Sequence, residues 1–163
     1  MITEEDENYK KFYEALLYVS KSLAMNIASD GEGATKLFEM TVENAQSKDQ
    51  AKVLAKSIIS SNLVKAMLYG NDANSGRILC AMGYSGESFD PEKVDLYIGD
   101  GKRELCIVKD GMYADYSEDE ATDILKSEKV TGRADIHMGS ASATAWGCDL
   151  TYDYVKINGD YRS

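Results

Sequence analysis

The segment FDPEKVDLYIGDGKRELCIVKDGM (residues 89–112) marks the point where the chain changes character. Residues 94–98 and 104–109 have the apolar and β-branched content of strands. Asp100-Gly101 and Asp110-Gly111 are dipeptides typical of tight hairpin turns. This segment therefore predicts β-hairpins.

The part of the chain before this segment carries helical patterns. Apolar residues recur at helical spacing over 4–28, a helix that Thr3 could cap. The glycines of Asp30-Gly31-Glu32-Gly33 should end it, and a strand should follow over 34–42. We expect further helices over 48–60 with Ser47 as cap, over 63–68, and over 77–82.

The remainder should be mostly strands. A short helix capped by Ser117 should run to Lys126, and strands are expected over 129–137 and 144–157, the last one bent or bulged. Helices first and strands later indicate an α+β fold. We expect a helix-rich part over 1–88 and a strand-rich lobe over 89–163.

The charge of the chain excludes several classes of partner. The formal net charge is -10, which repels phosphate backbones and anionic membrane surfaces, so we expect no nucleic-acid or membrane binding. No apolar run approaches the length of a membrane helix and no signal peptide is recognisable, so a cytoplasmic protein is expected. The three cysteines lack the spacing of a disulfide framework or a zinc site.

Generic motifs for cofactors and metals are incomplete. The glycines near residues 31–33 and 99–101 lack the third glycine of a dinucleotide-binding loop, and no phosphate-binding loop occurs. A calcium loop starting at Asp72 would have Gly76 in a ligand position. His137 is the only histidine and lies in a segment of strand character, which argues against histidine-based triads and multi-histidine metal sites. We expect no metal and no cofactor.

Three segments remain that are unusual in composition: DGEGATK (30–36), YGNDANSGR (69–77) and AWGCDLTYDYVKINGDYRS (145–163). Each alone could be a solvated turn, a set of helix caps or core packing. Taken together, in this order and spacing, they closely resemble the ornithine acetyltransferase family over essentially the whole chain.

This resemblance implies an activity and a fold. Family members move an acetyl group from N-acetylornithine to glutamate, and some also accept acetyl-CoA as donor. The precursor cleaves itself, and the new N-terminal threonine of the second chain is the nucleophile, with its own α-amine available as general base. The implied fold is a layered α/β/β/α sandwich with a smaller C-terminal lobe, in a heterotetramer of two copies of each chain.

The resemblance also implies three substrate-binding residues: Glu32, Asn158 and Ser163. The site must accept both a cationic and an anionic side chain, and amide and hydroxyl groups can donate or accept hydrogen bonds to either. The sequence departs from the family pattern at Ser75, where tryptophan is usual, and at Gly159 and Ser163, where alanine and threonine are usual.

The catalytic threonine has no counterpart in this sequence, since Thr3 is not N-terminal and its surroundings do not match the family's cleavage site. We therefore expect a substrate-binding portion whose partner is the missing N-terminal portion, and which is inactive by itself. The alternatives are a non-catalytic amino-acid-binding module, a structural relic, and a related N-terminal-nucleophile aminopeptidase.

Overall fold

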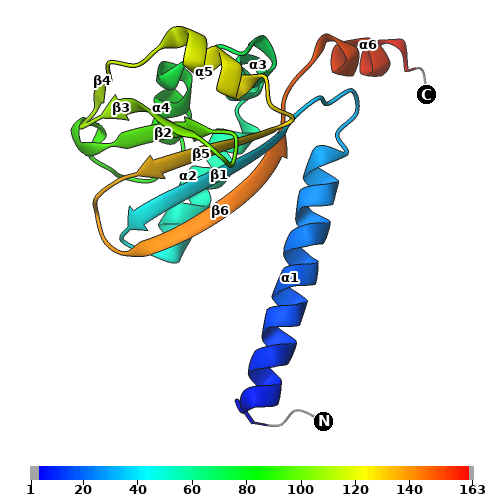
Figure 1. Ribbon diagram of the computed structural model, residues 1–163, viewed down its shortest axis with the longest axis vertical. Helices are drawn as coiled ribbons and strands as arrows, with labels where there is room; N and C mark the ends of the chain where they lie inside the picture. The colour runs from blue at the N-terminus through cyan, green and yellow to red at the C-terminus, as the bar shows by residue number, and fades with distance from the viewer. Residues whose placement is uncertain (1–3, 162–163) are drawn as a thin grey trace.

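The computed structural model describes residues 4–161, which form the helices and strands shown in Figure 1. In chain order they are α1 (Glu7–Ser29), β1 (Leu37–Ala45), α2 (Lys48–Ser60), α3 (Asn62–Gly70), α4 (Ser75–Gly83), a 3-10 turn (Pro91–Lys93), β2 (Asp95–Gly99), β3 (Glu104–Lys109), β4 (Met112–Tyr113), α5 (Glu118–Leu125), β5 (Lys129–Asp135), β6 (Ala141–Cys148) and α6 (Tyr152–Asp160).

The strands form one sheet in the order β4-β3-β2-β5-β1-β6. β1 pairs with β5 in parallel, and the other neighbours pair antiparallel. β2, β3 and β4 are joined by the two predicted Asp-Gly turns, in which Gly101 and Gly111 have positive φ values of 83° and 72°. These hairpins are confirmed.

The core lies on one face of this sheet. Phe38, Met40 and Val42 alternate along β1 and are at most 1% exposed, so they point to the same face. α2 packs against β1 and β6, α3 and α4 pack against α2, and α5 packs against β2. The predicted caps Ser47 and Ser117 begin α2 and α5.

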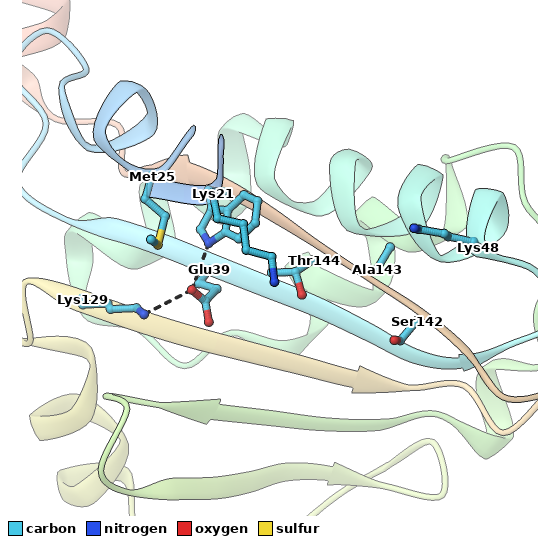
Figure 2. Close-up of a pocket in the computed structure, with 9 residues that line it drawn as sticks. Lys21, Met25, Glu39, Lys48, Lys129, Ser142, Ala143 and Thr144 are labelled. Atoms are coloured by element: carbon cyan, nitrogen blue, oxygen red, sulfur yellow. Dashed lines mark hydrogen bonds and ion pairs between the residues drawn. The ribbon is translucent and has the colours of Figure 1, made fainter. Parts of the chain in front are cut away.

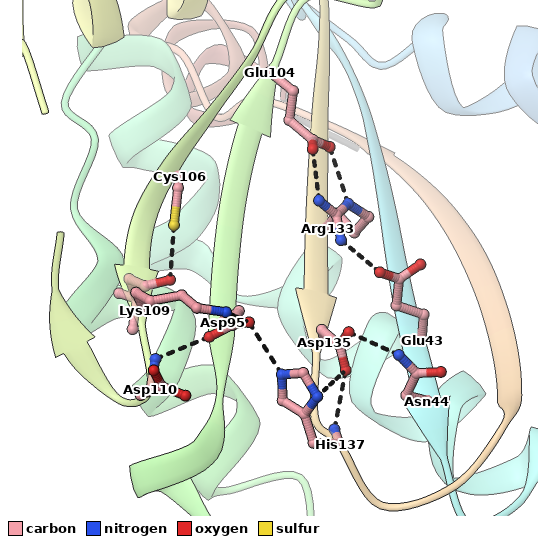
Figure 3. Close-up of polar contacts among 11 residues, drawn as sticks. Glu43, Asn44, Asp95, Glu104, Cys106, Lys109, Asp110, Arg133, Asp135 and His137 are labelled. Carbon is pink, nitrogen blue, oxygen red and sulfur yellow. Dashed lines mark hydrogen bonds and ion pairs between the residues drawn. The ribbon is translucent and has the colours of Figure 1, made fainter.

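The opposite face of the sheet is polar and is not covered by α2 to α5. Trp146 donates its indole N–H to Glu39 over 2.9 Å, and the Lys129 ammonium lies 3.1 Å from the same carboxylate (Figure 2). Farther along this face, Arg133 pairs with Glu104 at 2.6 Å (Figure 3). The side chains of this face are therefore held by ion pairs and remain partly exposed to solvent.

Helix α1 extends away from the sheet and contacts it mainly through β1 and β6 (Figure 1). None of its residues is buried. Its apolar side chains are nevertheless numerous, and Phe12, Leu16, Leu23 and Ile27 are all more than half exposed. Such a continuous apolar row on an isolated helix indicates a surface that normally packs against something else.

The C-terminal segment differs from the expected strand over 144–157. β6 ends at Cys148. The side chain of the next residue, Asp149, accepts hydrogen bonds from the backbone of Thr35 and Lys36, the two residues that precede β1. Thr151 then caps α6 by accepting a hydrogen bond from the Tyr154 N–H at 3.1 Å. The β-branched residues there favoured a strand, but the cap overrides that weak preference.

Smaller differences concern element ends. β1 starts at Leu37 rather than at 34, and β5 ends at Asp135 rather than at 137, where His137 has a positive φ of 49°. Helix α1 is capped by Asp6, and the expected cap Thr3 lies outside the described residues.

The α+β fold class is confirmed. Residues 4–161 form one sheet with helices packed on one of its faces. β1 lies between β5 and β6, so the sheet crosses the expected boundary between 88 and 89, and the two parts do not form separate sheets. No helix within 4–161 is long and apolar enough to cross a membrane.

Candidate functional site

The DGEGATK segment and the end of β6 are joined by the carboxylate of Asp149, which is 3% exposed. Its Oδ1 accepts the backbone N–H of Thr35 at 2.8 Å and of Lys36 at 3.1 Å, and its Oδ2 accepts the Thr35 hydroxyl at 2.6 Å. Three hydrogen bonds to one carboxylate therefore fix the start of β1 to the corner that leads into α6.

Lys36 fixes the same segment from the other side. Its buried ammonium donates to the carbonyl oxygens of Leu68 and Leu125, both at 2.6 Å, and to Asn71 Oδ1. Burial lowers the pKa of Lys36, although the charge of Asp149 opposes this. Since Leu68 lies in α3 and Leu125 ends α5, one side chain satisfies carbonyls of two helices and joins them to β1.

The two glycines around Glu32 let the end of β6 and the start of α6 come close to this loop. A Cβ atom on Gly31 would lie 2.7 Å from the Cys148 sulfur. A Cβ atom on Gly33, which has a φ of +67°, would lie 2.8 Å from the backbone nitrogen of Tyr154. The close neighbours of these two glycines are therefore β6 at Gly31 and α6 at Gly33, both of the same chain.

This approach brings two of the expected site residues together. The side-chain amide of Asn158 donates to Glu32 Oε2 over 2.9 Å, although the residues are 126 positions apart in sequence. The same amide also donates to the carbonyl oxygen of Tyr154 at 3.0 Å. Both Glu32 and Asn158 are exposed, so a carboxylate and an amide are presented together at the surface. Ser163, the third expected residue, lies outside the described residues.

A cavity of about 360 Å³ lies beside the first turn of α6. Tyr69 from α3 and Tyr152 from α6 meet there edge to face, with ring centroids 5.6 Å apart. Its walls are mostly apolar and are formed by Ala66, Tyr69, Gly70, Leu150, Thr151, Tyr152 and Val155. This cavity between α3 and the start of α6 is therefore suited to an uncharged group.

The YGNDANSGR segment is mainly structural. Asn71 ends α3 in a left-handed conformation and contacts Lys36, and Asn74 caps α4 by accepting the Arg77 N–H at 3.2 Å. Ser75 is 1% exposed, and its hydroxyl is the one buried side-chain polar atom without a partner within residues 4–161. The helix-capping interpretation of these amides is confirmed, and Ser75 is left with an unsatisfied hydroxyl.

A second polar cluster, not found from the sequence, lies at the opposite end of the sheet (Figure 3). The buried carboxylate of Asp95 contacts Lys109 at 2.5 Å, His137 Nε2 at 3.0 Å and the backbone N–H of Asp110 at 2.8 Å. Burial raises the pKa of Asp95, but these three partners outweigh it and lower the pKa to about 2. His137, the only histidine of the sequence, is thus a partner of the buried Asp95, a contact that no local sequence motif predicts.

Comparison with known proteins places this geometry in a family. The model of the ArgJ family matches residues 1–163. The "Arginine biosynthesis bifunctional protein ArgJ" of Caldanaerobacter subterraneus subsp. tengcongensis is 49% identical over 162 residues, which is 99% of this chain and 40% of that protein. ArgJ 1 of Clostridium acetobutylicum is 50% identical over 165 residues, covering 100% of this chain and 40% of that protein.

The fold agrees with a solved relative. The crystal structure of arginine biosynthesis bifunctional protein argJ from Bacillus halodurans matches with a TM-score of 0.92 at 44% identity, over 98% of this chain and 74% of that chain. The chain spans about 40% of the length of the curated relatives that it matches. Whole-chain agreement in sequence and fold shows that the chain belongs to the ArgJ family.

Proposed function

We propose that this chain is the substrate-binding portion of an arginine-biosynthesis acetyltransferase that moves acetyl from N-acetylornithine to glutamate. Membership of the ArgJ family supports the reaction class. The observation that carries the assignment of the site is the hydrogen bond between Asn158 and Glu32, which joins the two sequence segments that most resemble the acetyltransferases.

The chemistry of the pair suits two substrates of opposite side-chain charge. A carboxylate has lone pairs for several donors, so Glu32 can accept a hydrogen bond from a substrate ammonium while it still accepts the one from the Asn158 amide. The Asn158 side chain also carries a carbonyl oxygen, so it can meet either a donor or an acceptor on the substrate. Ser163 is proposed to add a hydroxyl of the same dual character. Acetyl-CoA as an additional donor, with no bound cofactor, belongs to the same proposal.

The proposal includes a partner, the portion of the enzyme that corresponds to the rest of the relatives' length. It would carry the nucleophile and the groups that stabilise the oxyanion, so this chain by itself is expected to be inactive. Two features support such a partner: the apolar row on α1 and the polar face of the sheet that α2 to α5 leave uncovered. A cytoplasmic heterotetramer remains part of this proposal.

The test is acetyl transfer from N-acetylornithine to glutamate, measured for this chain alone and after co-expression with the missing portion from a relative. Activity only in the co-expressed complex is the expected result. Activity of the chain alone would overturn the proposed absence of the nucleophile. A folded complex that binds ornithine but transfers no acetyl group would favour the amino-acid-binding module instead.

A further inference from the structure

The outer edge of β6 (Ala141–Cys148) is unpaired within the described part of the chain. β6 ends the strand order and has β1 as its one neighbour. Its sequence ASATAWGC contains no charged residue and no proline, the two features that commonly protect an edge strand from pairing with another chain. The backbone N–H and C=O groups on the outer side of β6 are therefore available for a further strand.

A groove follows this edge. One cavity of about 430 Å³ lies between β6 and α2, and a second of about 550 Å³ lies between β6 and α1 (Figure 2). Ala143, Thr144 and Trp146 line both. Successive residues of a strand point to opposite faces of a sheet. Because consecutive residues line both cavities, the groove runs around the edge itself and is not confined to one face.

The groove is bordered by lysines. Lys48, Lys52 and Lys56 follow one another on α2, and Lys21 reaches the groove from α1. All four are exposed, and within residues 4–161 none of them lies within salt-bridge distance of an acidic side chain. Although burial raises the pKa of the Glu39 carboxyl, Lys21 is near enough to help lower it, whereas the three lysines of α2 have no such neighbour among the described ion pairs. A cluster of unpaired cations is unexpected in a chain with a net charge of -10, and it creates a local positive potential beside the edge.

The spacing of the lysines matches an extended chain. Helix residues four apart rise about 6 Å along the axis, and alternate residues of a strand are separated by roughly 6.6 Å. Figure 2 shows the helix that carries Lys48 running beside β6. A strand added to β6 would thus present every second side chain to successive lysines of α2.

We propose that the edge of β6 docks an extended segment of another polypeptide that carries acidic residues at alternate positions. Backbone hydrogen bonds to β6 supply the affinity, and the lysines select the acidic side chains. Pairing of β6 with β6 of a second copy is disfavoured, because it would bring the lysine rows of the two copies close together. This docking surface does not include the Glu32–Asn158 pair and does not depend on the proposed reaction. The docked segment extends the sheet at the edge of β6, whereas the missing portion is proposed to cover α1 and the polar face of the sheet.

The test uses the single tryptophan of the chain, Trp146, which lines both cavities. The chain is titrated with a short capped peptide that has glutamate at three alternate positions and threonine between them. The fluorescence of Trp146 should change in a saturable and salt-sensitive way. A peptide of the same composition with consecutive glutamates should bind more weakly, and hydrogen exchange should show new protection of β6 amides.

A charge-reversed variant supplies the matched comparison. Lys52→Glu with Lys56→Glu should weaken peptide binding by about tenfold or more. Lys102→Glu with Lys126→Glu has the same net charge, lies away from the groove and should bind as the wild type does. Urea unfolding of both variants shows that the fold is kept.

Four results would overturn the proposal. Peptide binding could be weakened equally in both double variants, or the peptide could bind without protecting the β6 amides from hydrogen exchange. The wild type could form dimers through β6, or the charge-reversed variant could self-associate while the wild type binds no peptide. The last would mean that the lysines serve only to prevent edge pairing.

Discussion

Asp149 accepts three hydrogen bonds at the start of β1, two of them from Thr35, whose backbone N–H lies 2.8 Å and hydroxyl 2.6 Å from the carboxylate. This contact closes a loop of more than a hundred residues and sets the distance between the DGEG turn and α6. The hydrogen bond between Glu32 and Asn158 depends on that distance.

Asp149→Asn should therefore destabilise the chain. The amide keeps one acceptor oxygen but places an NH₂ group where a second acceptor is required, so a cost of about 1–3 kcal/mol in the free energy of unfolding is expected. Urea unfolding measures this cost, with the exposed Asp115→Asn as the control that removes a charge without a buried contact. An unfolding midpoint equal to that of the control would show that Asp149 does not hold the corner.

Asp95 predicts a specific dependence of stability on pH. Its folded pKa is about 2 and its unfolded pKa is 3.8, so the native state favours the ionised form. The stabilisation, on the order of 2 kcal/mol, is present above the unfolded value and is lost as the pH falls through the folded value.

The stability gap between the wild type and Asp95→Asn should consequently be largest near neutral pH and should shrink between about pH 4 and pH 2. Urea unfolding of both proteins across this range measures the gap. A gap that stays constant with pH would contradict the role of Lys109 and His137 as partners of the ionised carboxylate.

Ser75 offers the opposite kind of substitution. Its buried hydroxyl has no partner, so Ser75→Ala removes an uncompensated polar group and should raise the free energy of unfolding by up to about 1 kcal/mol. Ser57 is the matched control, because its hydroxyl donates to the Ala81 carbonyl oxygen at 2.6 Å, and Ser57→Ala should lower stability. Thermal unfolding of both variants measures the two changes in stability. A loss of stability in Ser75→Ala would show that the Ser75 hydroxyl does have a stabilising partner.

Two glycines near the site should respond differently to alanine. Gly33 has a positive φ, and a Cβ there would clash with the backbone of Tyr154, so Gly33→Ala should cost about 1–3 kcal/mol. Gly159 lies in exposed α6 with no atom within 4 Å of a Cβ, so Gly159→Ala should stabilise this helix by about 0.5–1 kcal/mol. Circular dichroism and urea unfolding measure both, and equal effects would argue against the close contact at Gly33.

Much of the fold could be predicted from local signals. Side-chain caps such as Ser47 and Ser117 and the two Asp-Gly turns have chemistry that acts within a few residues, and these elements formed where expected. The prediction of a strand over 144–157 was wrong in its second half, because Val155 and Ile157 favour strands by themselves but lie in α6. The contact of Asp149 with Thr35, which a local pattern does not contain, ends β6, and α6 then starts at its cap Thr151.

The candidate site divides in the same way. The resemblance named Glu32 and Asn158, and the structure adds the hydrogen bond between them and the buried supports Lys36 and Asp149. The supports could not be recognised, because a lysine and an aspartate in polar segments look like surface residues until the chain folds. The role of Asp95 could not be predicted for the same reason, since its partners come from β3, the turn that follows β3 and the residues just after β5.

The substrate-binding role of Glu32 and Asn158 is the central claim, and a double-mutant cycle tests it most directly. kcat/KM for acetyl transfer is measured in the co-expressed complex for Glu32→Gln, Asn158→Ala and the double variant, with the exposed Lys156→Ala on α6 as the control. We predict that each single change lowers kcat/KM by about tenfold or more, that the control does not, and that the double variant loses less than the product of the two. Activities equal to that of the wild type in a complex of unchanged stability would contradict the account.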